Sequence, residues 1–187
     1  KKCSKMADRI LRLMEDPMTY KEYSGFIAEL ERRWDDETES LSFFYLPSAD
    51  LHYWQTPQLF GPEVADCFPS ASNDIEEAGK CLACHRGTAT VFHLMRVMES
   101  ALIVTAKKLG IPYAPSWESY LRVMKDRIDT KWKKKGIVWK RDEPFFREVY
   151  GNLHAVKVAW RNPTMHVVKD YTPCQAKDVY NVVGAFM

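Results

Sequence analysis

The sequence contains little of what several protein classes require. Its 187 residues include eight glycines and five cysteines, and the formal net charge is only +2. This small net charge argues against a protein that coats nucleic acid with its whole surface, although a local basic patch is compatible with it. The cysteines are odd in number and irregularly spaced, which argues against a disulfide framework. We therefore expect free thiols in a reducing, cytoplasmic compartment.

Long apolar runs, strand patterns and clustered acids are also missing. No apolar run is long enough to cross a bilayer and no secretory leader is evident, so we expect no association with a membrane. No acidic cluster suits a two-metal nuclease, and we expect neither a metal nor a cofactor. The chain is long enough for one domain with a sizeable core, and 46% hydrophobic and 28% charged residues are ordinary for a soluble protein.

Helix signals dominate the remaining pattern and predict an all-α bundle. Apolar residues at helical spacing predict a first helix over residues 1–15, and a capping box at Thr19–Glu22 opens a second that ends near residue 39. Residues 73–109 contain no proline and predict the longest helix, with a bend near Gly79 or Gly87. Further helices are predicted over residues 116–134, 142–160 and 173–187.

Residues 41–72 differ from the rest, because four prolines interrupt them and aromatic residues crowd them. We interpret them as an irregular connection whose aromatic side chains pack on the core, with a contact role as the alternative. The sequence then divides into N-terminal helices with this connection, residues 1–72, and a helical bundle, residues 73–187. Together they are expected to form one compact domain.

Most of the usable chemistry lies near the end, between Arg161 and His166. Arginine offers phosphate a planar fork of donors, and histidine exchanges protons near neutral pH. Asn162 is a good helix N-cap and Pro163 a good first helical residue. The pattern therefore predicts a helix break that turns Arg161 and His166 toward one point, beside free amides that favour an anion.

The spacing alone is weak evidence. At a slightly longer spacing Arg86 with His93, and Arg147 with His154, match as well. The alternative interpretation is an arginine that ends a helix and a partly buried histidine. Only Arg161 is followed by a neutral polar residue and then a proline, and this separates it from the other two arginines.

Residues 160–187, WRNPTMHVVKDYTPCQAKDVYNVVGAFM, resemble the C-terminal part of HEPN domains, and residues 68–110 resemble the long central helix of bacterial members. The resemblance maps the family signature onto Arg161, Asn162 and His166. It implies an all-α bundle that often dimerises, and a metal-independent endoribonuclease of toxin–antitoxin or antiphage systems. It also implies RNA as a partner and allows an antitoxin or defence-system partner protein.

Several other residues are candidates for substrate contact. His93, Arg96 and Glu99 recur at intervals of three and either form surface ion pairs or support His166 and a phosphate. Lys169 follows the motif. Lys133 and Lys134 belong to a basic cluster with Trp132 and Trp139 interleaved, which is either a solvated loop or an RNA-binding strip.

One pattern points to different chemistry. Cys81, Cys84 and His85 match the C-x-x-C-H spacing of covalent haem attachment. They lie inside the predicted central helix, and a zinc site would need two further ligands that are not close in sequence. We therefore expect buried or half-buried thiols.

The sequence predicts an endoribonuclease in which His166 moves protons and Arg161 stabilises phosphate charge. The alternative is a non-catalytic dimeric module that binds a nucleotide, RNA or protein. A purely structural dimer, with Arg161 buried in an ion pair, is the third hypothesis.

Overall fold

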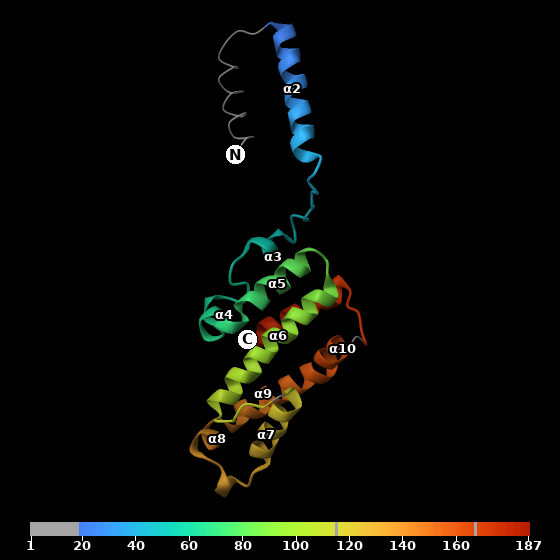
Figure 1. Cartoon of the computed structure of the whole chain (residues 1–187). Helices are drawn as coiled ribbons and strands as arrows, with labels where there is room; N and C mark the ends of the chain where they lie inside the picture. The colour runs from blue at the N-terminus through green and yellow to red at the C-terminus, as the bar shows by residue number, and fades with distance from the viewer. Residues whose placement is uncertain (1–18, 115, 167) are drawn as a thin grey trace. The chain divides into compact units, whose positions relative to one another are not determined.

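The computed structural model describes residues 19–114, 116–166 and 168–187. Every regular element in these ranges is helical, so the predicted all-α class is confirmed. The chain divides into two compact units, Lys1–Tyr45 and Leu46–Met187 (Figure 1). The helix predicted over residues 1–15 lies outside the described residues.

The described part of the first unit is one helix followed by a segment without regular secondary structure. Helix α2, Tyr20–Thr38, begins at the predicted capping box, in which the Glu22 amide donates to Thr19 Oγ1 and the Glu22 carboxylate accepts from the Thr19 amide. No residue of α2 is buried. The aromatic side chains at residues 43–45 are exposed, so the prediction that they pack on a core is wrong. The described part of this unit buries no α2 residue and so offers them no core.

In the second unit, the proline-rich stretch forms short helices. They are α3, Leu51–Gln55; α4, Pro62–Cys67; and the 3₁₀ turn η1, Pro69–Ala71. Two prolines occupy first turns, where their missing N–H does no harm. Tyr53 is buried and the Phe60 ring lies 4.9 Å from that of Tyr180. For these two aromatics the predicted packing on the core is confirmed.

The single long helix expected over residues 73–109 is two helices, α5, Ser72–Ala83, and α6, Gly87–Lys108. The break falls just before Gly87. His85 takes a left-handed conformation with φ 57°, and the Arg86 amide donates to the Cys81 carbonyl at 2.8 Å, which closes the end of α5. Gly87 lies against later backbone, because an added Cβ would be 2.2 Å from the Tyr171 carbonyl oxygen.

Helix α6 is the centre of the second unit (Figure 1). Leu94, Met98 and Leu102 are fully buried, and α5 and the last helix, α11, Pro173–Phe186, pack along it. By length and composition α6 could cross a membrane, although charged residues interrupt its apolar sequence and no membrane association was expected. This is weak evidence, because half of its most apolar window is buried in the bundle and core helices pass the same test.

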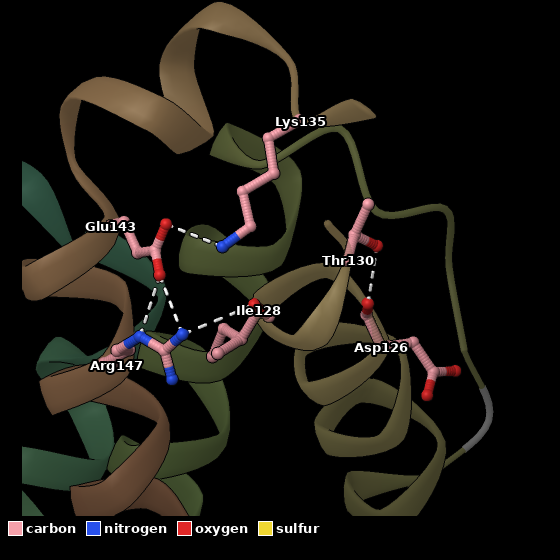
Figure 2. Close-up of polar contacts among 6 residues, drawn as sticks. All are labelled: Asp126, Ile128, Thr130, Lys135, Glu143 and Arg147. Carbon is pink, nitrogen blue, oxygen red and sulfur yellow. Dashed lines mark hydrogen bonds and ion pairs between the residues drawn. The ribbon is translucent and has the colours of Figure 1, made fainter. Parts of the chain in front are cut away.

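The remaining helices form the other end of the unit: α7, Trp117–Asp129; the 3₁₀ turn η2, Trp132–Lys134; α8, Ile137–Arg141; and α9, Glu143–Val156. Figure 2 shows the polar contacts that tie α9 to α7 and to the connection before α8. Lys135, only 4% exposed at its side chain, donates to Glu143 at 2.6 Å. Arg147 donates to the other oxygen of Glu143 and to the Ile128 carbonyl. These hydrogen bonds hold the pKa of Glu143 below its ordinary value.

Candidate functional site

The helix does not break between Arg161 and His166, contrary to the sequence prediction. α9 continues into a π-helical turn, η3, Lys157–Arg161, and then directly into α10, Asn162–Met165. Asn162 has helical φ and ψ of −65° and −49° and is not an N-cap. His166 ends α10 and does not begin a new helix.

The π turn explains how a helix passes through Pro163. Proline has no amide hydrogen, and its ring clashes with the carbonyl four residues earlier in a regular α-helix. Here the turn immediately before it is wider, and the Asn162 amide donates to the Lys157 carbonyl, five residues back. Turns of this kind recur at functional sites. Because the helix continues, the free amides and positive helix end predicted beside Arg161 are not there.

Arg161 therefore closes the π turn, and His166 follows the last residue of the continuous helix. On a regular α-helix, positions five apart project about 140° from one another. Arg161 is half-buried, and its one hydrogen bond within the described residues is a long one of 3.4 Å to Asn162 Oδ1. His166 is exposed, and its imidazole has no hydrogen-bond partner in the part of the chain that the structure describes. Both side chains can meet a ligand, but no described contact joins them.

The backbone around these two side chains is held more firmly than the side chains themselves. Tyr171 is 6% exposed, and its hydroxyl lies 3.3 Å from Thr164 Oγ1 and 3.5 Å from the Trp160 carbonyl. The Tyr171 amide donates to Thr88 Oγ1 at 3.0 Å, which fastens the segment after α10 to the first turn of α6. Lys169, which the sequence suggests as a substrate contact, is exposed. Its ammonium lies 4.8 Å above the Tyr171 ring.

A second polar cluster lies between α5 and α6. His93 Nδ1 and Arg96 Nε are 2.9 and 2.7 Å from the same oxygen, Oδ1 of the buried Asp74. Burial acts to raise the pKa of Asp74, but the hydrogen bonds from Arg96 and His93 outweigh it and the pKa is lowered. Glu99 contributes a weaker electrostatic interaction with Arg96.

Sequence reasoning missed Asp74. The Asn73–Asp74 pair is typical of a helix cap, but α5 begins at Ser72 without a side-chain cap. An available signal was the register, because Asp74 precedes Ile75 and lies four positions before Ala78, both of which are buried. A carboxylate on that face needs a partner from a neighbouring helix.

The second cluster does not face the first candidate site. Thr88 bonds the segment that follows His166, whereas His93 bonds α5. Thr88 and His93 are five positions apart on α6 and project about 140° from each other. No described contact links His93, Arg96 or Glu99 to His166, so their predicted support of His166 stays a prediction.

The basic cluster, which in the sequence also includes Lys135 and Arg141, offers fewer free cations than its sequence suggests. Lys135 is buried against Glu143 (Figure 2), and Arg141 pairs with Asp142 at 2.6 Å. Lys133 and Lys134 are exposed in η2. The side chains of Trp132 and Trp139 lie outside the described part of the chain, so the stacking role predicted for them is untested.

The cysteines and the histidine of the C-x-x-C-H pattern do not act together, because each has its own local environment. Cys81 and Cys84 are half-buried free thiols, as predicted, and burial raises the pKa of Cys81. His85 Nε2 is 2.9 Å from Asp50 Oδ2. Within the described residues, no group of three or more histidine, cysteine or acidic side chains is arranged to hold a metal ion.

In comparisons with known proteins, no protein-family model, curated protein or solved structure matches this chain. The residues and their geometry therefore carry the functional argument.

Proposed function

We propose that this protein is a metal-independent, cytoplasmic endoribonuclease that acts through Arg161 and His166, with Asn162 steadying the guanidinium. The observation that carries the proposal is that these two side chains make few hydrogen bonds within the described residues and can be reached by a ligand. Arg161 has most of its donors uncommitted, and His166 has an accessible imidazole. Arg161 is the last residue of the π turn, His166 follows α10, and the surrounding backbone is anchored by Tyr171.

The chemistry requires only what RNA and these residues supply. A neutral imidazole of His166 accepts the proton of a ribose 2′-hydroxyl, and the oxygen attacks the adjacent phosphorus. Arg161 donates to the non-bridging oxygens as their charge grows. The bond to the 5′-oxygen breaks and that oxygen takes a proton from an imidazolium. The products are a 2′,3′-cyclic phosphate and a 5′-hydroxyl, and DNA, which lacks the 2′-hydroxyl, is not cleaved.

The lack of a described contact between Arg161 and His166 within one chain, and the angle of about 140° expected for positions five apart on an α-helix, suggest that two copies build the site together. Across a two-fold axis, Arg161 of one copy would face His166 of the other. Exposed apolar side chains on the same segment support this arrangement: Val158, Met165 and Val168 are 56%, 38% and 75% exposed. An apolar groove of about 350 Å³ runs beside Trp160, between α9 and α11.

Cleavage of RNA in EDTA tests the activity. We expect wild type to cleave, and Arg161→Ala and His166→Ala to lose about 10²-fold or more. His154→Ala, which removes another exposed imidazole on α9, is the matched control and should cleave like wild type. Equal cleavage by all four proteins would rule out the assignment, because a contaminating nuclease gives that result.

Mixing the two inactive variants tests the shared site. If each site takes Arg161 from one copy and His166 from the other, half of the randomly mixed dimers keep one intact site. The mixture then recovers about a quarter of wild-type activity. A site contained within one chain recovers none, since every chain in the mixture lacks one of the two groups.

A second candidate is a non-catalytic dimeric module that binds RNA, a nucleotide or a phosphorylated partner through Arg161. The observation that favours it is the lack of any described contact between Arg161 and His166. It predicts binding that His166→Ala leaves intact, with no cleavage by either protein. A toxin–antitoxin or antiphage context, with an antitoxin or defence-system partner, belongs to the first candidate, and the neighbouring genes would test it.

A further inference from the structure

In the cluster of Asp74, His93 and Arg96, the exposed fraction of the side chain rises from the core to the surface. The side chain of Asp74 is 9% exposed, that of His93 25% and that of Arg96 55%. The carboxylate lies beneath the two donors and accepts from both through one oxygen. The arrangement therefore holds an imidazole and a guanidinium side by side at the surface of α6.

The bonds to Asp74 leave particular donors available. The carboxylate takes Nε of Arg96, so the two terminal nitrogens keep the planar fork that fits phosphate oxygens. It takes Nδ1–H of His93, so Nε2 remains, and Nε2 becomes a donor when the ring binds a second proton. None of these three nitrogens has a hydrogen-bond partner in residues 19–114, 116–166 and 168–187. A fixed pair of outward donors loses less conformational entropy on binding than two free side chains do.

We propose that Asp74, His93 and Arg96 form a phosphate-binding site, distinct from the Arg161–His166 segment. Arg96 binds two phosphate oxygens through its terminal nitrogens, and the imidazolium form of His93 donates to a third through Nε2–H. Asp74 is a positioning residue that keeps both donors in place. The ligand is a phosphate group, from either a nucleotide or an RNA backbone.

The charges around the site refine the proposal. Asp74 offsets one positive charge, so inorganic phosphate should bind weakly, and a ligand with additional contacts should bind more tightly. Glu99 acts on Arg96 from the same helix and opposes an anion. Glu99→Gln should therefore strengthen phosphate binding by about two-fold, the size of a weak surface ion-pair effect.

The test is side-chain ¹⁵N NMR on the full chain carrying His166→Ala, so that the result does not depend on RNA cleavage. We expect inorganic phosphate to shift the His93 and Arg96 side-chain signals saturably. Arg96→Gln should weaken binding about ten-fold or more, as expected for losing a charge-assisted hydrogen bond. Arg96→Lys, which keeps the charge but not the fork, should lose a similar factor, and Arg122→Gln, an exposed arginine on α7, should lose none.

Two further ligands identify the source of the phosphate. Adenosine 5′-monophosphate and a 2′-O-methyl RNA are titrated in parallel, and the one whose affinity depends on Arg96 and exceeds that of inorganic phosphate is the ligand class. The absence of a saturable shift, or equal weakening by Arg96→Gln and Arg122→Gln, would overturn the proposal. The cluster would then be only an ion-pair contact between α5 and α6. His93→Gln, whose amide can still donate to Asp74, provides a variant that should keep the fold.

Discussion

The two candidate regions differ in what holds their functional groups. Around Asp74 the side chains themselves are held, since one buried carboxylate takes a hydrogen bond from both His93 and Arg96. Around Arg161 the side chains are nearly unbonded, and the backbone is held by Tyr171 and Gly87. The first arrangement suits the binding of a ligand of fixed shape. The second suits groups that complete a site only when RNA or a second copy arrives.

Gly87→Ala should have the largest effect, because it displaces the backbone on which the second arrangement depends. Its Cβ would meet the Tyr171 carbonyl oxygen at 2.2 Å, and backbone does not rotate away as a flexible side chain does. We expect a loss of about 3 kcal/mol in the free energy of unfolding, measured by urea denaturation. RNA cleavage should fall as well, since the segment after His166 moves.

Gly151→Ala is the matched control for this prediction. An added Cβ at Gly151 meets nothing within 4 Å, and the residue lies inside α9. Alanine should therefore stabilise the helix by about 0.5–1 kcal/mol. If Gly87→Ala behaved like Gly151→Ala, the close approach of α6 to Tyr171 would be wrong.

Asp74→Ala removes the acceptor that holds the first cluster and should have the next largest effect. It leaves the half-buried His93 ring without its partner, and we expect a loss of about 2 kcal/mol in the free energy of unfolding. Denaturant unfolding of Asp74→Ala against wild type gives the value. The side-chain NMR signals of His93 and Arg96 should broaden together, because both lose the same oxygen. Unchanged signals would mean that the cluster is held by something other than Asp74.

The two regions also differ in how far the sequence predicts them. Capping boxes are local: the one at Thr19 opens α2 where predicted, and one at Thr172 opens α11 at the predicted start. Asp74 looks like a cap in sequence, but its partners lie 19 and 22 residues away. A local pattern cannot separate these two uses of an acidic residue.

The continuity of the helix through Pro163 shows the same limit. Local rules place a helix start at Asn162 and Pro163, and the prediction of converging side chains depended on that start. The helix continues because the chain widens into a π turn before the proline. Tyr171, eight residues later, packs its hydroxyl near the Trp160 carbonyl of that turn. The residues of the candidate site could be named from the sequence, but their directions depended on a tertiary contact.

Acid should weaken the first region through Asp74. Its pKa is lowered in the folded protein, so the unfolded chain binds a proton more readily. The stabilisation is therefore complete above the ordinary carboxyl pKa of about 3.9 and is lost as the pH falls through the lower folded value. Urea unfolding of wild type and Asp74→Asn, compared at several pH values, should show a stability difference that is constant above about pH 5 and shrinks below about pH 4. A difference that grew on acidification would contradict the lowered pKa.

Tyr171→Phe should have a smaller effect on the second region. The hydroxyl contacts are 3.3 and 3.5 Å long, and the ring remains to fill its buried place. We expect a loss of about 0.5–1 kcal/mol in the free energy of unfolding, with a modest decrease in RNA cleavage. Tyr113→Phe, on a side chain 86% exposed, is the control and should change neither quantity. Equal effects of the two variants would mean that the Tyr171 hydroxyl does not anchor this segment.

His166→Gln should change stability least, by less than about 0.5 kcal/mol, because the side chain is exposed and has no hydrogen-bond partner in the described structure. The melting temperature of the purified variant measures this directly. The small effect is informative because it separates the two regions. Asp74 variants should mainly lose stability, whereas His166→Gln should lose RNA cleavage while its stability stays that of wild type. A large drop in melting temperature would instead reveal that His166 has a structural partner, for example in a second copy. It would also assign the lost cleavage to unfolding and remove the main support for a catalytic imidazole.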